Sequence, residues 1–414
     1  MSCENGIKLH PMRENKIKIV YLWALLAVPL LLSTHRPPAG KKTALNRRVL
    51  EQRLHQLARK AEGYLPKVAV DSLKIPRALD PNGSLHGTGS REWTSGFYSG
   101  TLWQLYRFSK RERLREYAET WMAFQEKEKQ DPRTHDLGFK IYCSFGEAYR
   151  TEPLDRYRQI ILEASRTLIR RFNPTVGAIR SWDHSRDKWG YPVIIDNMMN
   201  LDMLFTATRF SGDSAFYHVA RKHAETTLKN HFREDGSSCH VVDYDTLSGE
   251  VLHRQTHQGA AHGSAWSRGQ AWGLYGFAMV WRETKDPRFL EQAKTIARFF
   301  FQHPRLPADK IPYWDFDAPG IPAEPRDASA AAIAACGLLL LYEADPQSQY
   351  LEWADDILNS LAQSEYAAHT APFLLQHSVG NLPSRSEIDV PIVYADYYYV
   401  EALLRRLQIA KNPM

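Results

Sequence analysis

Two kinds of helical segment alternate along this chain, and this alternation restricts its fold more than any other feature. One kind is amphipathic: Leu114, Ala118 and Trp121 mark an apolar stripe among charged residues, which predicts a helix with one face in water. The other kind, for example residues 267–281 and 327–343, carries almost no charge and is rich in small and aromatic residues. A helix that is apolar nearly all round must be buried on every side. The second kind therefore has to lie inside a shell formed by the first.

The two kinds of segment recur as pairs. Three amphipathic segments open near Asp213, Asp286 and Asp345, 73 and 59 residues apart, which points to an internal structural repeat. The uncharged segments begin near Thr94, Asp136, Ile195, Trp266, Asp327 and Ala395. About twelve helices in about six hairpins predict an all-α (α/α)6 toroid, with the uncharged helices as its inner ring. A small β-hairpin between residues 238–244 and the stretch near Gly249 is expected to decorate one mouth of the barrel.

Polar and aromatic residues gather at the N-terminal end of each uncharged segment. They are Trp93-Thr94, His135-Asp136, Asp196-Asn197, Trp266-Ser267-Arg268, Arg326-Asp327 and Tyr394-Ala395-Asp396. In a ring of parallel inner helices these ends meet at one mouth, where unpaired N–H groups and positive dipole ends favour carboxylates or sulfates. Helix capping explains Asp327 and part of Asp396, but it does not explain the Trp, His and Arg residues at the same ends. This mouth is the predicted functional site.

The positive charge of the chain lies at its N-terminus. Residues 1–48 contain nine Lys and Arg against two Glu, which gives this segment +7; because the whole chain carries +6, the rest carries −1. The body therefore lacks the basic field that dominates nucleic-acid binding. No nucleic-acid partner is expected.

An uncharged run of fourteen residues, 19–32, follows the basic head. It is short for a membrane span and has the length of the apolar region of a secretory signal. We predict an export signal or signal-anchor with a short linker in residues 1–42, followed by the catalytic barrel in residues 43–414. The protein is then exported, periplasmic or at the cell surface, and meets a membrane only through this segment. A buried core helix is the alternative for the run.

Cysteine and histidine give no sign of a bound metal or cofactor. Of the three cysteines beyond the leader, Cys143 and Cys336 lie in apolar helical stretches, as expected of core residues. His253 and His257, with His262 nearby, have some resemblance to a zinc site. No Glu lies between the first two as in a metalloprotease, and the neighbouring Gly and Gln residues indicate a loop. We expect no metal and no cofactor.

Several motifs follow one another in a fixed order. They are HDLGF at 135–139, IDNMMNL at 195–201, WSRGQAW at 266–272, YWDFDAP at 313–319, PRDASAA at 325–331 and YADYY at 394–398. Together, over roughly residues 90–410, they resemble the unsaturated glucuronyl hydrolases, glycoside hydrolase family 88. The resemblance implies the (α/α)6 barrel and the removal of a 4,5-unsaturated uronic acid from oligosaccharides, most of all those from glycosaminoglycans.

The resemblance also implies roles for individual residues. Asp196 matches the catalytic acid/base of the family, and Asp136 matches its second essential carboxylate. The implied substrate contacts are the aromatic walls Trp93, Phe97 and Trp272, the polar residues His135, His240, Thr256, Gln258 and Arg268, and the serines Ser384 and Ser386 near a sulfated or acetylated neighbouring sugar. Arg254 occupies a position where the family often has a small residue, which leaves the shape of the outer subsite open.

The residue types suit that chemistry. Polysaccharide lyases leave a C4=C5 double bond in the terminal uronic acid, an enol ether conjugated to a carboxylate. Protonating C4 develops positive charge at C5 and the ring oxygen, so one carboxyl must be protonated first and then act as a base toward water attacking C5. A low-dielectric barrel mouth and a neighbouring carboxylate both raise a pKa toward that task. No second carboxylate needs to attack the anomeric carbon, unlike in ordinary glycosidases.

Each assignment has a structural alternative. Asp136 and Asp196 could be plain helix caps, Arg268 could pair with a structural Asp, and Trp93 and Trp272 could be core residues. Both carboxylates open unusually apolar helices, which favours a functional role for them.

Other functions also stay open at this point. An unsaturated rhamnogalacturonyl hydrolase, acting on pectin fragments, shares the fold and part of the motifs. A polysaccharide lyase needs a Tyr/His/Asn constellation in an open groove and leaves the two carboxylates idle. A non-catalytic glycan-binding protein at the cell surface needs only aromatic residues and Arg, and acidic groups in its pocket would repel an anionic sugar. The carboxylates therefore favour catalysis, while the parent polysaccharide and the oligomeric state are left undetermined.

Overall fold

The computed structural model describes residues 44–412. The predicted leader in residues 1–42 and its boundary with the barrel lie outside the described residues. Among the residues that are described, no helix combines the length and the apolar character needed to cross a membrane.

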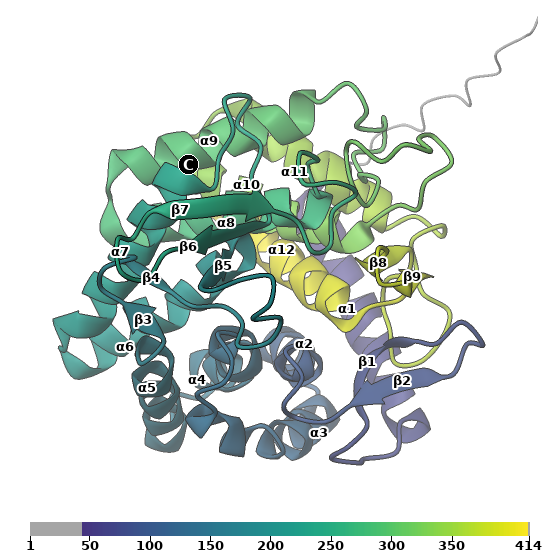
Figure 1. The fold of residues 1–414 in the computed structure, drawn as a ribbon. Helices are drawn as coiled ribbons and strands as arrows, with labels where there is room; N and C mark the ends of the chain where they lie inside the picture. The colour runs from purple at the N-terminus through teal and green to yellow at the C-terminus, as the bar shows by residue number, and fades with distance from the viewer. Residues whose placement is uncertain (1–43, 413–414) are drawn as a thin grey trace, which may run out of the picture. The chain divides into compact units, whose positions relative to one another are not determined.

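The described helices form two concentric rings (Figure 1). The outer ring consists of α1 (Arg47–Tyr64), α3 (Glu112–Ala123), α5 (Asp155–Ile169), α7 (Ser214–Asn230), α9 (Pro287–Gln302) and α11 (Ser348–Leu361). The inner ring consists of α2 (Ser95–Ser109), the π-helix η3 (Gly138–Gly146) with α4 (Glu147–Thr151), the 3-10 helix η4 (Ile195–Asn200) with α6 (Leu201–Ser211), α8 (Ser267–Thr284), α10 (Ala328–Ala344) and α12 (Val393–Lys411). Each inner segment packs on the next, and α12 returns to α2. The predicted (α/α)6 toroid is confirmed.

Burial explains which helices lie inside. Every residue of α10 from Ala328 to Leu341 is buried, whereas α9 buries only one stripe, which includes Phe289, Ile296 and Phe300. Apolar area removed from water is the main driving force for such packing. The uncharged helices can therefore sit only in the middle of the barrel, as their composition predicts.

Two helix boundaries test the predicted start signals. Asp286 caps α9 through a bond from the backbone N–H of Arg288, with Pro287 at the first helical position, as expected. The prediction for α11 is slightly wrong, because this helix begins at Ser348 and not at Asp345. The backbone N–H of Asp345 instead donates to Leu341, so Asp345 closes α10.

Four small antiparallel sheets decorate the described barrel. The expected hairpin is present as β6 (Val241–Tyr244) and β7 (Val251–Gln255), and β5 (Pro192–Ile194) adds a third strand to it. Three further hairpins were not expected: β1 (Ile75–Leu79) with β2 (Leu85–Thr88), β3 (Phe172–Asn173) with β4 (Ala178–Ile179), and β8 (Ser378–Asn381) with β9 (Ser386–Val390). These strands are too short to carry a clear alternating pattern.

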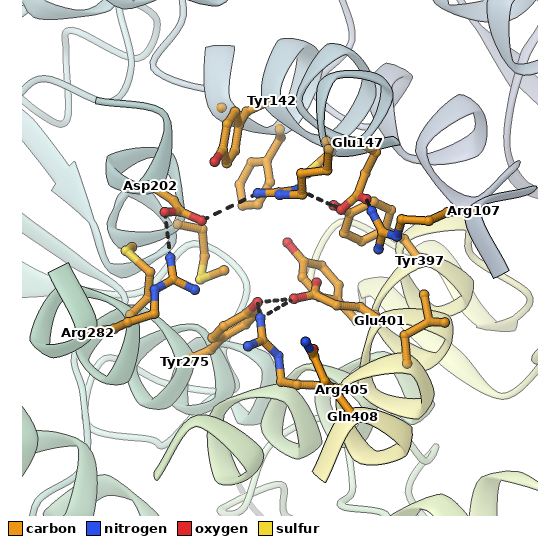
Figure 2. A pocket seen from close by; sticks show the side chains of 18 residues that line it. Arg107, Tyr142, Glu147, Asp202, Tyr275, Arg282, Tyr397, Glu401, Arg405 and Gln408 are labelled. Atoms are coloured by element: carbon orange, nitrogen blue, oxygen red, sulfur yellow. Dashed lines mark hydrogen bonds and ion pairs between the residues drawn. The ribbon is translucent and has the colours of Figure 1, made fainter. Parts of the chain in front are cut away.

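A cavity of about 350 Å³ lies inside the inner ring and extends from Gly138 and Phe139, at the start of η3, to Arg107, Arg282 and Gln408 near the C-terminal ends of α2, α8 and α12. Figure 2 shows arginines and carboxylates alternating around it. Arg107 and Arg150 bind Glu147, and Arg282 binds Asp202 with 2.8 Å between Nη2 and Oδ1. Helix C-termini carry partial negative charge, so cations are favoured there. This network joins α2, α4, α6 and α8 at the end of the barrel away from the predicted site.

Glu147 is the centre of this network and provides a test of its contribution to stability. Burial alone would raise the pKa of Glu147, but Arg107 and Arg150 outweigh it and lower this pKa to about 2. Because the folded pKa is depressed, the ionised carboxylate stabilises the fold above its unfolded pKa, and this stabilisation is lost as pH falls toward about 2.

We expect Glu147→Gln to lower the free energy of unfolding at pH 7 by about 3–5 kcal/mol, because it leaves two arginines without their buried partner. Urea denaturation at pH 7 and at pH 3 measures the effect. The difference in the free energy of unfolding between the variant and wild type should be smaller at pH 3 than at pH 7. Glu112→Gln is the matched control, since Glu112 is exposed and its Arg115 partner is 3.7 Å away. Equal stability of Glu147→Gln and wild type at pH 7 would contradict the prediction.

Candidate active site

Asp136 and Asp196 lie at the N-terminal ends of neighbouring inner segments. Asp136 stands two residues before η3, and Asp196 is the second residue of η4. The strand β5 leads directly into η4, and its pairing with β6 is continued by a bond from the Ile195 N–H to the carbonyl of His240. The three-stranded sheet therefore places His240 beside Asp196, with 3.7 Å between Nε2 and Oδ2.

Asp196 has the environment of a general acid. Its side chain is 12% exposed, and Oδ2 has no hydrogen-bond partner among the described residues. Burial raises the pKa of Asp196 to about 7; Arg268 opposes this rise and the negative charge of Asp136 adds to it. A carboxyl with such a pKa is partly protonated near neutral pH and can donate a proton.

Asp136 is held by its own chain neighbours. The Thr134 hydroxyl donates to Oδ2 at 3.1 Å, and the same hydroxyl oxygen accepts the Asp136 N–H at 3.0 Å. His135 Nε2 lies 3.1 Å from Oδ1, outside hydrogen-bonding geometry. The other ring nitrogen of His135 bonds the carbonyl of Ser181 at 2.8 Å, and burial lowers the pKa of this imidazole. A neutral His135 therefore donates to Ser181 through Nδ1, and its unprotonated Nε2 lies beside Asp136 without a hydrogen bond between them.

His240 presents the opposite tautomer. Its Nδ1 accepts the backbone N–H groups of His257 and Gln258, each at 3.2 Å, and burial lowers the pKa of the ring well below its usual value. The proton of the neutral ring is then on Nε2, which has no partner among the described residues. His240 thus offers a free N–H donor next to Asp196, where a bound ligand can accept it.

Thr256 and Gln258 support this arrangement. Thr256 Oγ1 accepts the N–H of Gly259 at 2.7 Å and lies 3.5 Å from Nδ1 of His240. Gln258 Nε2 donates to the carbonyl of Gly380 at 3.0 Å, and the same side chain lines the cavity at the mouth. Direct substrate contact by these two residues stays a prediction.

Arg268 forms the structural pair that the sequence left open as an alternative. It is buried and pairs with Asp327 at 3.3 Å, while its other donors reach the carbonyls of Val379 and Gly380. Its guanidinium also lies 4.6 Å from the ring centre of Trp266. Asp327 meanwhile caps α10. Arg268 therefore anchors β8 to the inner ring, and only Nε lacks a partner within the described residues.

The predicted aromatic walls occupy two levels. Trp93 is half-buried and lines the mouth. Phe97 and Trp272 are completely buried and pack with Phe139 in a layer below Trp93. Neither Phe97 nor Trp272 has exposed surface with which to contact a sugar, and the indole N–H of Trp272 faces Asp196 and lowers its pKa. In this structure Phe97 therefore supports the pocket floor.

Ser384 and Ser386 lie on the β8–β9 hairpin, outside the lining of the mouth cavity. Ser384 is exposed, and its backbone N–H donates to Asn381 Oδ1 at 3.2 Å. The hairpin residues that do line the cavity are Gly380, Asn381 and Glu387. The predicted contact of the two serines with a neighbouring sugar stays a prediction.

The mouth contains residues that the sequence motifs do not include. Its cavity of about 190 Å³ is also lined by Arg77, Trp182, His184 and His257, together with Tyr394 of the YADYY motif. Arg77 forms ion pairs with Glu92 and with Glu387, which is 310 residues away in the chain. No local pattern signals such a pair. Trp182, which packs edge-on to His257 and close to Trp189, gives at least an aromatic signal in the sequence.

Unsatisfied polar atoms distinguish this mouth from the larger cavity inside the inner ring. Around the larger cavity the charged groups pair with one another, and among its described lining residues only Arg405 Nε lacks a partner (Figure 2). Near the two carboxylates the atoms without partners are Asp196 Oδ2, His135 Nε2, His240 Nε2, Arg268 Nε and Trp272 Nε1. Buried polar groups are normally paired, so a cluster of exceptions marks the place where a ligand completes the bonding. The mouth is therefore the candidate active site.

No group of three His, Cys, Asp or Glu side chains within residues 44–412 is placed to hold a metal ion. The histidines near the mouth have other contacts. His253 lies 3.6 Å from Asp243, and His262 Nδ1 accepts the N–H of Thr256 at 3.2 Å.

Comparison with known proteins agrees with the motifs. The model of Glycosyl Hydrolase Family 88 matches residues 76–305. An unsaturated glucuronyl hydrolase of Formosa agariphila is 47% identical over 326 residues, which cover 78% of this chain and 82% of the relative. The crystal structure of an unsaturated glucuronyl hydrolase specific for heparin superposes with a TM-score of 0.82 at 45% identity, covering 88% of this chain and 97% of the other.

A second solved structure, the unsaturated glucuronyl hydrolase from Bacillus sp. GL1 that is responsible for glycosaminoglycan degradation, has a TM-score of 0.79 at 33% identity and covers 86% of this chain and 96% of its own. These matches extend over the barrel and include both carboxylate-bearing segments. The resemblance predicted from the motifs is confirmed, and the chain belongs to glycoside hydrolase family 88.

Proposed function

We propose that this enzyme removes the 4,5-unsaturated uronic acid from the non-reducing end of lyase-generated oligosaccharides, with glycosaminoglycan fragments as its substrate class. The observation that carries the proposal is Asp196, a buried carboxyl with a pKa of about 7 next to a second carboxylate. The relatives that act on heparin or other glycosaminoglycans support the substrate class.

The geometry suggests a division of labour between the two carboxyl groups. Protonated Asp196 donates its proton to C4 of the double bond, and positive charge develops at C5 and the ring oxygen. The Asp136 carboxylate stabilises this charge, because the buried mouth strengthens electrostatic attraction. Asp196, now a carboxylate, then takes a proton from the water that attacks C5. The resulting hemiketal opens and releases the sugar.

The anionic substrate needs hydrogen-bond donors that have no other partner in the protein. His240 Nε2–H and Arg268 Nε–H are unpartnered donors near Asp196, whereas the indole N–H of Trp272 faces Asp196 itself. The parallel N-termini of the inner helices add positive dipole ends at the same mouth. Arg77 pairs with both Glu92 and Glu387, and burial raises the pKa of Glu92, so the negative charge that these two acids present to the uronate is reduced. We infer that the substrate carboxylate faces the His240 and Arg268 side.

Asp196→Asn should abolish turnover, with a loss of at least about 10²–10⁴-fold in kcat, because an amide cannot shuttle the proton. In the wild-type enzyme kcat/KM should fall as pH rises through about 7, since the raised pKa of Asp196 keeps the acid form only below that value. Steady-state rates with an unsaturated disaccharide across pH 5–9 measure both effects. Circular dichroism and substrate binding by the variant serve as the control for folding. A near-native rate in the variant would rule out this assignment.

The double bond should be obligatory. Hydrolysis in heavy water should place deuterium at C4 of the released product, while the ultraviolet absorbance of the conjugated double bond disappears as sugar is freed. A saturated glucuronide of the same linkage should stay intact. A panel of unsaturated disaccharides from chondroitin, heparin, hyaluronan, gellan and pectin identifies the parent polysaccharide. Cleavage of the saturated analogue at a comparable rate, or C4 without deuterium, would mean an ordinary glycosidase mechanism.

We also propose that residues 1–42 export the protein to the periplasm or cell surface, on the basis of the basic head and the uncharged run at residues 19–32. Fusion of residues 1–42 to a reporter that works only outside the cytoplasm should give activity. Replacing residues in the uncharged run by Asp should abolish it, because a charged run no longer inserts. An inactive wild-type fusion, expressed at the level of a fusion with an established signal, would refute export.

A further inference from the structure

Neither of the two carboxylates begins an ordinary α-helix. Asp136 leads into the π-helix η3, and Asp196 lies in the 3-10 helix η4. Both helix types depart from the α-helical hydrogen-bond pattern, and such departures are frequent at functional sites. The backbone of each segment is therefore less constrained by its own helix, and its position depends more on contacts with its neighbours.

A direct contact joins the two segments below the carboxylates. The backbone N–H of Phe139 donates to Oδ1 of Asn200 at 3.2 Å. Asn200 is completely buried, and its Nδ2 has no partner within the described residues. The single hydrogen bond that this amide makes among those residues is thus the one that crosses from η4 to η3.

The approach of the two backbones at this contact requires glycine. A Cβ atom added to Gly138 would lie 2.6 Å from Asn200 Oδ1 and 2.7 Å from Asn200 Cα. Such distances are below van der Waals contact, and one of the two atoms belongs to the backbone, so a methyl group would have to push η3 and η4 apart. Gly138 and Asn200 together therefore set how closely the two segments meet. We call this contact, between Gly138 and Phe139 on η3 and Asn200 on η4, the joint.

The other link between the two segments near the carboxylates is indirect. His135 bonds the carbonyl of Ser181, and Ser181 in turn bonds Pro192 and Ile194 of β5, which leads into η4. Thr134 holds Asp136 within its own loop, and the sheet positions His240 against Asp196. Neither contact ties one carboxylate segment to the other. Gly138 is two residues from Asp136, and Asn200 is one helical turn from Asp196, so the joint is close enough to control both.

We propose that Asn200, together with Gly138, is a positioning residue that fixes the separation of Asp136 and Asp196 for the proton-transfer steps. The inference rests on the proposed function, because it assigns a task to the spacing of those two groups. Its consequence is kinetic. A displacement of catalytic groups by about 1 Å can reduce a rate by about 10²-fold, while substrate binding depends on many contacts and changes less.

The pH dependence of kcat/KM gives a second measure of the separation of Asp136 and Asp196, one that does not depend on the size of kcat. The titratable and charged groups that face Asp196 are Asp136 before η3, His240 before β6 and Arg268 on α8. Burial makes the main contribution to the raised pKa of Asp196, Arg268 opposes it, and Asp136 raises it further. Moving Asp136 away weakens its contribution, so the pKa of Asp196 falls and the basic limb of the pH profile moves to lower pH.

The test measures kcat, KM and the pH profile of kcat/KM on an unsaturated chondroitin disaccharide, followed by loss of ultraviolet absorbance. Asn200→Ala and Gly138→Ala should each lower kcat by about 10–100-fold, leave KM within about twofold, and shift the basic limb to lower pH. Asn200→Asp keeps the oxygen that accepts the Phe139 N–H, so it should retain most of kcat.

Thr206→Val is the matched control, because Thr206 also links the same two inner segments. Its hydroxyl lies 2.6 Å from that of Tyr142 on η3, farther along the barrel from the carboxylates. This variant should lower the melting temperature and leave kcat and the pH profile unchanged. If Asn200→Ala and Gly138→Ala alter only stability, as Thr206→Val does, the joint does not position the carboxylates.

The outcomes separate this inference from the proposed function. If wild-type enzyme fails to cleave every unsaturated disaccharide of the panel, the proposed function fails. If wild type cleaves but both joint variants keep native kcat and pH dependence, only the inference fails. If Asn200→Ala does not fold, the other two variants still test the inference. Gly138→Ala is expected to lower kcat, whereas Asn200→Asp is expected to retain most of it.

Discussion

The inner helices have no face that can remain in water, and the rest of the molecule follows from this constraint. Residues of α10 from Ala328 to Leu341 are buried all round, so this helix and its counterparts must be enclosed by a second ring. Polar chemistry on such helices is then confined to their ends. The barrel thereby concentrates functional groups at two mouths and excludes them from its centre, where Phe97, Phe139 and Trp272 pack against one another.

The two mouths differ because all inner helices point the same way. At the N-terminal mouth the dipoles favour anions, and unpartnered donors and acceptors surround Asp196. At the C-terminal mouth the dipoles favour cations, and Arg107, Arg150 and Arg282 neutralise them together with paired carboxylates. The larger cavity is therefore the one in which charges already satisfy each other. A ligand gains most where polar atoms still lack partners, which is the N-terminal mouth around Asp196.

The sequence predicts the barrel well, because the barrel depends on local patterns, and the structure brings the predicted carboxylates Asp136 and Asp196 to neighbouring helix ends at one mouth. Uncharged composition identifies the inner helices, and their N-terminal residues identify the mouth. The sequence could not decide whether Arg268 contacts Asp327 or the substrate, since both uses place a buried arginine at the same helix end. It also missed Arg77, whose partner Glu387 lies 310 residues away. Phe97 and Trp93 are one helical turn apart, yet only Trp93 reaches the cavity, and periodicity alone does not reveal that difference.

The elements that the sequence did not predict include the two hairpins at the outer rim of the site. The hairpins β1–β2 and β8–β9 come from opposite ends of the described chain and meet through Arg77 and Glu387. Arg268 fixes β8 from below through the carbonyls of Val379 and Gly380. In the proposed mechanism the inner ring supplies the proton-transfer groups, while the loops anchored to it form the outer wall of the mouth. Selection among parent polysaccharides should accordingly depend on these hairpins, because changes there alter the rim without moving either carboxylate.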